Sequence, residues 1–263
     1  MQFDELIHLE PHGADTYVGT GPRYPWGGLY GGQIVAQALR AAASTVEPAF
    51  VPHSLRAYFI RAGDHTEPVR YEVDRTRNGR SFCTRRVVAR QALGAILNLE
   101  ASFHVAEETE QLQLVAMPDV PGPDAFDESS WSTAFERRMA PRDTGAPVLS
   151  WFRMPAGTGS DDPLAHVAGL AYISDDLPTD AVARVVGADF EDGQGWFSVS
   201  LDHAVWFHRP IRIDDWHLET FTCGGFANGR GLALGHVFTP DGTHAATIAQ
   251  EVLIRRRRDE RHD

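Results

Sequence analysis

Two polar side chains stand where the surrounding pattern predicts burial. Asp175 lies four residues after Ala171 and continues the apolar stripe of a predicted helix near its C-terminal end. Burial and the negative end of the helix dipole both disfavour a charged carboxylate, so we expect a raised pKa for Asp175. The alternative is a solvated carboxylate just past a frayed helix end, because residues 176–178 carry helix-terminating signals.

Gln250 is the second such side chain and lies in the last predicted strand. It shares a strand face with Ala246, Ile248, Val252 and Ile254. A lone amide in apolar surroundings costs about 1–3 kcal/mol unless it is hydrogen-bonded. Gln250 therefore needs a polar partner, which is either another site residue or a neighbouring backbone group or buried water.

Ser200 and Asp202 lie on the less apolar side of an earlier strand. Their spacing of two residues predicts a shared face. This makes Asp202 a competitor of Asp175 for the role of catalytic carboxylate. The simpler interpretation of Asp202 is a carboxylate that accepts hydrogen bonds from strand or loop amides.

Several common catalytic chemistries are absent from the sequence. It has no Gly-x-Ser-x-Gly, His-Glu-x-x-His, phosphate-loop or dinucleotide-binding motif. All 24 basic residues are Arg, which excludes covalent lysine chemistry. His203 and His208 are expected on opposite strand faces, and the only cysteines, Cys83 and Cys223, are expected to be buried and reduced. We therefore expect no metal site and no cofactor.

Composition and charge restrict the partners and the location. The chain has 263 residues, of which 43% are hydrophobic, and its net charge is −12. This acidity opposes binding to nucleic acids and anionic membrane surfaces. No apolar run reaches the ~18 residues of a membrane span, and the first residues lack a signal-peptide pattern, so we expect a folded cytoplasmic protein.

An internal repeat predicts the elements that position these side chains. The segment 53–61 resembles the segment 202–209, and Asn78-Gly79-Arg80 recurs at 228–230, a period of about 150 residues. Each Asn-Gly pair separates two strand-like runs, which indicates a tight hairpin. The expected strands are 69–73, 81–90 and 95–105 in the first half and 218–223, 232–238 and 244–254 in the second.

Each half also has one predicted helix that should pack on its sheet. The first covers residues 33–43 and is rich in alanine. The second begins at Asp162-Pro163, a cap residue followed by proline in the first turn. Between the halves, residues 106–150 contain five prolines and predict an irregular connector, with a short helix possible near 131–139.

Six segments, taken in order, resemble the type II acyl-CoA thioesterases of the TesB kind. They include a Tyr-Gly-Gly-Gln helix start and an Asp-His-x-x-Trp-Phe-His motif. The segments are Tyr30–Leu39, His53–Asp64, Asn78–Phe82, Ala101–Phe103, Leu201–Pro210 and Ala249–Glu251. Together they span nearly the whole chain.

The resemblance implies an α+β double hotdog fold, two tandem units in each of which a curved antiparallel sheet wraps a long helix. The units would be residues 1–105 and 151–263, joined by the linker 106–150, with the catalytic residues in the second unit. It also implies hydrolysis of fatty acyl-CoA to free fatty acid and CoA by direct attack of water. The family's water-holding Asp, Thr or Ser, and Gln fall on Asp175, Ser200 and Gln250.

The remaining expectations concern binding and the rival functions. Gly31 and Gly32 are candidate substrate-binding positions, because backbone amides at a helix start can stabilise an oxyanion. His53 is a weaker candidate that is better explained as a structural histidine. The main rival is a non-catalytic acyl-CoA or acyl-carrier binding protein. A hotdog hydratase is disfavoured, because its Asp and His dyad with a following Asn-Pro is missing. A homo-oligomer is expected.

Overall fold

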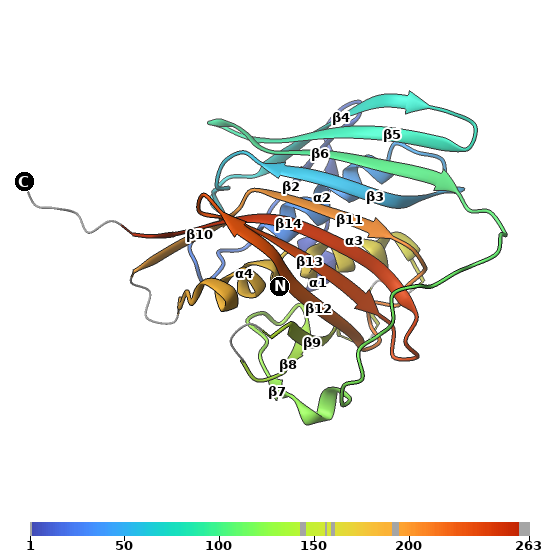
Figure 1. Ribbon diagram of the computed structural model, residues 1–263. Coiled ribbons are helices and arrows are strands. Elements are labelled where there is room, and N and C mark those ends of the chain that lie inside the picture. The colour runs from blue at the N-terminus through green and yellow to red at the C-terminus, as the bar shows by residue number, and fades with distance from the viewer. Residues whose placement is uncertain (1, 143–145, 156, 159–160, 191–194, 258–263) are drawn as a thin grey trace, which may run out of the picture.

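The protein consists of one continuous, highly twisted sheet with its main helices on one side (Figure 1). The computed structural model describes residues 2–142, 146–155, 157–158, 161–190 and 195–257. Its helices are α1 (Phe3–Leu6), α2 (Gly31–Ala43), α3 (Pro163–Ile173), α4 (Pro178–Val186) and a 3-10 turn at Pro123–Ala125.

The strands fall into two consecutive groups along the chain, one before the connector and one from the connector onwards. The first group is β1 (Glu10–Pro11), β2 (Thr16–Gly19), β3 (Phe50–Phe59), β4 (Val69–Asn78), β5 (Phe82–Gln91) and β6 (Gly94–Val105). The second group is β7 (Asp127–Glu128), β8 (Glu136–Met139), β9 (Val148–Arg153), β10 (Trp196–Ser200), β11 (Asp202–Phe207), β12 (His217–Ala227), β13 (Arg230–Phe238) and β14 (His244–Arg256).

The two groups join edge to edge into a 14-stranded sheet. Its order is β1-β2-β4-β5-β6-β3-β11-β14-β13-β12-β9-β8-β7, with β10 beside β14. The seam is the antiparallel pair β3 and β11, in which Trp206 lies opposite Ser54. Helix α2 contacts β2 to β6 of the first half, as predicted, whereas α4 is the helix that contacts β12, β13 and β14 of the second half; α3 packs mainly against α2. This confirms the predicted double hotdog architecture.

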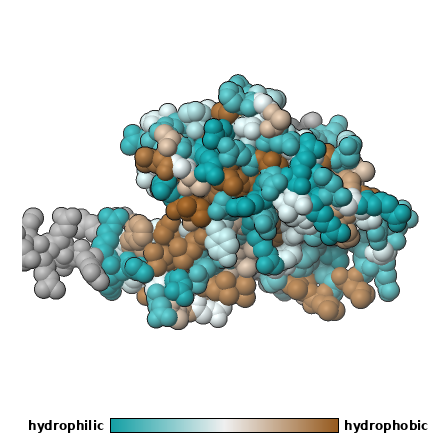
Figure 2. Space-filling view, turned by 90° about the horizontal axis from the view of Figure 1, so that it is seen from above, coloured by the Kyte–Doolittle hydropathy of each residue, from teal (hydrophilic) through white to brown (hydrophobic). Residues whose placement is uncertain are grey.

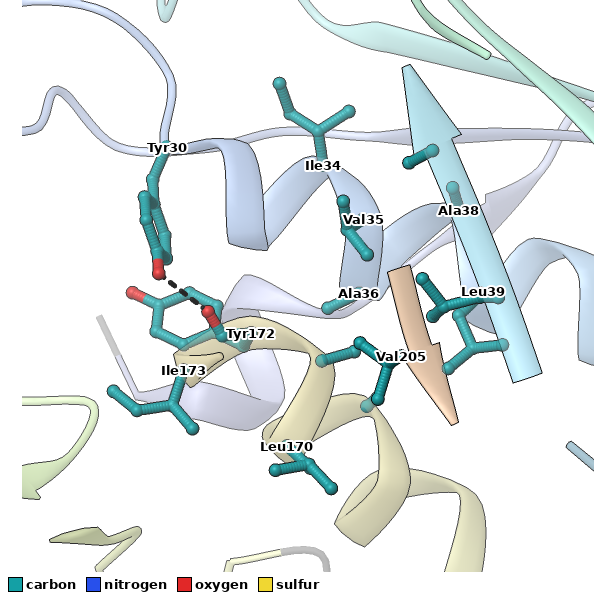
Figure 3. Packing of buried hydrophobic residues seen from close by; sticks show 14 of the residues in the cluster. Tyr30, Ile34, Val35, Ala36, Ala38, Leu39, Leu170, Tyr172, Ile173 and Val205 are labelled. Atoms are coloured by element: carbon teal, nitrogen blue, oxygen red, sulfur yellow. Dashed lines mark hydrogen bonds between the residues drawn. The ribbon is translucent and has the colours of Figure 1, made fainter. Parts of the chain in front are cut away.

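The core lies between these two helices and the sheet (Figure 3). Helix α2 is alanine-rich and buried on almost every side, so it is a central helix rather than a surface one. Its N-terminus meets the C-terminus of α3 very closely, because a Cβ at Gly32 would lie 2.1 Å from the backbone oxygen of Tyr172. Tyr30 secures this junction by donating a hydrogen bond to the same oxygen at 2.8 Å.

The helix-start prediction in the second half is confirmed. Asp162 caps α3 by accepting a hydrogen bond from the Leu164 amide at 3.0 Å, and Pro163 occupies the first turn. The helix ends before residues 176–178, as expected. A further helix, α4, then begins at Pro178 and ends at Gly187, whose φ of 66° closes it. The sequence reasoning missed α4, although its proline start and glycine stop are recognisable signals.

The connector between the halves is more regular than predicted. The suggested short helix near 131–139 is wrong, because β8 pairs with β9 there, with Glu136 opposite Arg153. Within β8 only Arg137 is buried. These short strands extend the second half of the sheet along its outer edge.

The two Asn-Gly turns differ in geometry. Asn228 and Gly229 have φ values of 52° and 76° and form a two-residue hairpin between β12 and β13, as predicted. The turn after Asn78 is wider, because Asn78 lies opposite Cys83 and Gly79 donates its amide to Phe82. The hairpins are therefore correctly placed, but only the second is tight.

Candidate active site

The candidate site lies where α2 begins and α3 ends, so both halves of the chain contribute to it. Asp175 follows α3 by two residues, and Gly31 opens α2. A Cβ at Gly31 would lie 2.6 Å from Asp175 Oδ2 and 2.8 Å from the Phe59 ring. Glycine at this position lets the helix start approach the carboxyl group.

The carboxyl group of Asp175 is buried, with 7% of the residue exposed. Burial raises its pKa to about 7, against the opposing effect of the Ser200 hydroxyl, the Gln250 amide and the backbone N–H of Gly32. Its Oδ1 atom makes no hydrogen bond to protein groups. Asp175 is thus a carboxyl that changes protonation near neutral pH and has an acceptor oxygen left for a ligand.

Gln250 connects the other two polar groups of the site. It is fully buried and donates a hydrogen bond from Nε2 to Ser200 Oγ at 2.8 Å. Its Oε1 atom lies 2.5 Å from Nδ1 of His203. The prediction that Gln250 needs polar partners is confirmed. The structure brings Asp175, Ser200 and Gln250 together from three separate segments of the chain.

A one-residue irregularity separates Ser200 from Asp202. Ser200 in β10 lies opposite Val252, whereas Ala204 in β11 lies opposite Ala249, so four residues on one side match three on the other. The extra residue reverses the alternation of faces, as in a β-bulge. As a result Ser200 faces Gln250, together with His203.

Asp202 therefore lies on the opposite face, and the expectation that it shares the face of Ser200 was wrong. Its Oδ1 accepts a hydrogen bond from the Glu251 amide at 2.7 Å. Partial burial raises its pKa, while that backbone hydrogen bond lowers it. These contacts match the simpler interpretation of Asp202 as a carboxylate that bonds a strand amide.

His53 is not brought to the site. Its Nε2 lies 2.8 Å from Ser102 Oγ, and its ring contacts the rings of Phe82 and His104. Partial burial and the neighbouring His104 lower its pKa. These are the contacts of a structural histidine. Gly31 and Gly32, by contrast, lie at the helix start beside Asp175, and the Gly32 amide faces its carboxyl group.

A second set of contacts anchors the residue after Asp175, and no sequence pattern indicated it. Asp176 accepts hydrogen bonds from the Trp131 ring N–H at 2.7 Å and from the buried guanidinium of Arg137. Both donors come from the connector. Their role was not predictable, because the partner lies about 40 residues away with no repeated spacing to reveal it.

A cleft of about 510 Å³ lies beside this anchor. Its lining combines apolar, aromatic and hydroxyl side chains with one arginine: Leu6, Pro22, Arg23, Tyr24, Pro25, Trp131, Ser132 and Thr133. Trp131 packs edge-on against Tyr30, with ring centroids 5.2 Å apart, and Tyr30 packs against Tyr172 at 5.0 Å. The aromatic group thereby connects the cleft to the helix ends that carry Asp175 and Gly31.

Within the described ranges, no group of three His, Cys, Asp or Glu side chains is arranged to hold a metal ion. Both cysteines are free. Cys83 is buried as expected, but Cys223 is only partly buried, because β12 bulges between Cys223 and Gly225.

Comparisons with known proteins agree with this architecture. Residues 20–104 match the family model of the acyl-CoA thioesterase N-terminal domain, and residues 111–254 match that of the C-terminal domain. The chain belongs to the acyl-CoA thioesterase family. It is therefore a thioester hydrolase with acyl-CoA as its substrate class.

Several members of the acyl-CoA thioesterase family resemble the chain over most of its length. Acyl-coenzyme A thioesterase 8 of Homo sapiens is 34% identical, covering 95% of this chain and 88% of that one. Acyl-CoA thioesterase 2 of Haemophilus influenzae is 33% identical, covering 86% and 87%. The crystal structure of the acyl-CoA thioesterase II TesB2 from Mycobacterium marinum is 34% identical and superposes with a TM-score of 0.87, covering 99% and 100%.

Proposed function

We propose that Asp175, Ser200 and Gln250 hold a water molecule that attacks the thioester carbonyl of acyl-CoA directly. The observation that carries this proposal is the convergence of three polar side chains in an otherwise apolar interior. Gln250 bonds Ser200 at 2.8 Å, and both face the buried carboxyl group of Asp175. A thioester is reactive enough to be hydrolysed without a covalent serine intermediate, and no nucleophile elbow is present.

Each group has a distinct role in this scheme. Asp175 acts as general base and takes a proton from the water as its oxygen bonds to the carbonyl carbon. The carbon–sulfur bond then breaks, and the proton passes to the departing CoA thiolate. Backbone amides at Gly31 and Gly32, where the positive end of the α2 dipole lies, or the Gln250 amide, stabilise the oxyanion. The products are a free fatty acid and CoA.

The wider organisation follows from the same scheme. We infer two hotdog units, residues 1–105 and 151–263, joined by the linker 106–150, with the second unit supplying the three catalytic side chains. The cleft beside Trp131 has an aromatic side and a polar side that includes Arg23, and we place the acyl chain against the aromatic side. Within the described ranges no helix is long and apolar enough to cross a membrane. We propose the cytoplasm as the site of action.

We also propose a homo-oligomer, for which the outer sheet face gives support. Phe197 and Val199 on β10 and Leu232 and Leu234 on β13 lie on either side of β14 and are 40–44% exposed. Hydrophobic side chains also interrupt the hydrophilic surface in the space-filling view (Figure 2). Exposed apolar patches on a sheet are typical of subunit interfaces.

The proposed site is tested by acyl-CoA hydrolysis, followed through the release of CoA thiol. Asp175→Asn keeps the shape of the side chain but removes the base, and we expect kcat to fall about 100-fold or more. Asp202→Asn is the matched control and should keep most of the wild-type rate. If Asp202→Asn lost more activity than Asp175→Asn, Asp202 would be the general base. Wild-type protein that binds acyl-CoA without releasing CoA would instead support the non-catalytic binding protein.

A further inference from the structure

A fourth polar side chain, His203, lies behind Gln250, and the scheme above assigns it no role. It is fully buried in β11, although imidazole rings are usually at least partly exposed. Its two ring nitrogens each have one polar partner. Nδ1 lies 2.5 Å from Gln250 Oε1, and Nε2 lies 2.9 Å from Ser174 Oγ.

These partners determine which ring nitrogen carries the hydrogen. Burial lowers the pKa of His203 to about 4, so the ring is neutral near pH 7 and has a single N–H. An amide oxygen can only accept, so Nδ1 must be the donor to Gln250. Nε2 is then a bare acceptor, and the Ser174 hydroxyl donates to it at 2.9 Å in preference to the Ala171 carbonyl, which lies 3.4 Å away.

The His203 ring in turn fixes the orientation of the Gln250 amide. With Oε1 held by the ring N–H, the NH₂ group points at Ser200 Oγ and faces Asp175. A flipped amide would turn its oxygen toward the carboxylate, and Nδ1 could then accept from the NH₂ group only if the ring hydrogen moved to Nε2. Ser200 accepts from Gln250, and its own hydroxyl hydrogen is left to face Asp175.

We propose that His203 and Ser174 are positioning residues that orient the Gln250 amide, in a single line of hydrogen bonds that runs from Ser174 through His203, Gln250 and Ser200 to the accepting carboxylate of Asp175. This inference rests on the proposed function and deepens it. Because Ser174 directly precedes Asp175 in the chain, the line returns to the segment that carries the base. Every donor in it points toward the carboxylate and so favours its charged, proton-accepting form.

The competing explanation of His203 is that it only fills space in the core. Two substitutions separate these roles. His203→Asn retains an N–H near the Nδ1 position but leaves a small void. His203→Leu fills more of the space but has no donor. If His203 only fills space, the kcat of His203→Leu should equal or exceed that of His203→Asn. If His203 positions Gln250, the kcat of His203→Asn should be the higher one.

The experiment measures kcat, KM and the pH dependence of kcat/KM for both variants, with the fold checked by circular dichroism and thermal melting. We expect His203→Leu to lower kcat roughly 10- to 100-fold with little change in KM, because a misplaced catalytic group costs that much. The acid limb of its kcat/KM profile should move to higher pH, because the pKa of Asp175 rises when the carboxylate loses an ordered hydrogen-bond donor. His203→Asn should recover much of kcat. Tyr30, the other ionisable group that faces Asp175, has a pKa well above 10 and does not titrate in this range.

Ser174→Ala supplies a second test that leaves the ring in place. It removes the donor to Nε2 and should lower kcat several-fold with the same alkaline movement of the acid limb. This variant decides the question if His203→Leu does not fold. A folded Ser174→Ala or His203→Leu protein with the wild-type kcat and acid limb would overturn the inference, as would equal losses in the Asn and Leu variants.

Failure of the positioning role can be told apart from failure of the proposed site. If only the positioning role is wrong, Asp175→Asn still abolishes turnover, while the two His203 variants do not differ. If the proposed site itself is wrong, Asp175→Asn keeps the wild-type kcat.

Discussion

The ionisation of Asp175 gives the sharpest quantitative prediction. Its pKa of about 7 means that the group is half protonated near neutral pH, and only the charged form can accept a proton from water. We therefore expect kcat/KM to rise with pH through a single acid limb centred near 7. An exposed aspartate with an ordinary pKa of about 4 would give a flat profile over the same range.

The expected magnitude follows from the charged fraction. For a pKa of about 7, roughly nine-tenths of the enzyme is active at pH 8, one-tenth at pH 6 and one-hundredth at pH 5. kcat/KM should thus fall about tenfold from pH 8 to 6 and about tenfold again to 5. His203, with a pKa of about 4, does not contribute to this limb.

The assay should use a disulfide reagent such as 4,4′-dithiodipyridine, which detects released CoA thiol in acid as well as at neutral pH. A second buried carboxyl, Glu219, has a pKa raised by burial to about 8 and is the main confounding group. Glu219→Gln should keep the limb. A wild-type profile that is flat between pH 5 and 8, or a limb lost in Glu219→Gln, would refute the assignment of the base.

Two further predictions concern space and buried charge. Gly31→Ala should lower kcat/KM about tenfold or more, because its Cβ would lie 2.6 Å from Asp175 Oδ2. Gly122→Ala is the control and should leave kcat/KM unchanged, because nothing lies within 4 Å of its added Cβ. Equal kcat/KM values for the two variants would contradict the packing argument. Glu219 is fully buried, and burial raises its pKa despite Arg137 and Ser150 nearby, so stability is lost as pH rises from about 4.5 to about 8. Urea unfolding should show Glu219→Gln gaining a few kcal/mol over wild type at pH 8 but little at pH 5, and a pH-independent difference would count against this.

Much of the architecture was predictable because its signals are periodic. The repeat, the alternating strands and the capped start of α3 at Asp162-Pro163 each follow from local spacing, and all appear in the structure. The burial of Gln250 followed from the four apolar residues on its face. Asp175 was a weaker case from the residues alone, since the same pattern also fitted a solvated helix end.

The errors arose where long-range packing decides the outcome. The predicted strand face of Asp202 was wrong, because a single extra residue near Leu201 reverses the alternation of side chains between the two faces. Nothing in the local sequence marks that bulge. The strand β8 lies where a short helix was suggested, and its buried Arg137 bonds Asp176, a partner far along the chain. His203 was set aside as an unlikely metal ligand, and its contacts with Ser174 and Gln250 became visible only in the folded chain.

The most direct test of the central claim follows the oxygen of the attacking water. Excess enzyme is mixed with acyl-CoA in ¹⁸O-labelled water for a single turnover. The masses of the free fatty acid and of the peptide that contains Asp175 are then measured by mass spectrometry. Direct attack by a water held at Asp175, Ser200 and Gln250 predicts that the label enters the free fatty acid and that the protein stays unlabelled. Label in the Asp175 peptide would show a covalent anhydride on that carboxyl group and would contradict the account.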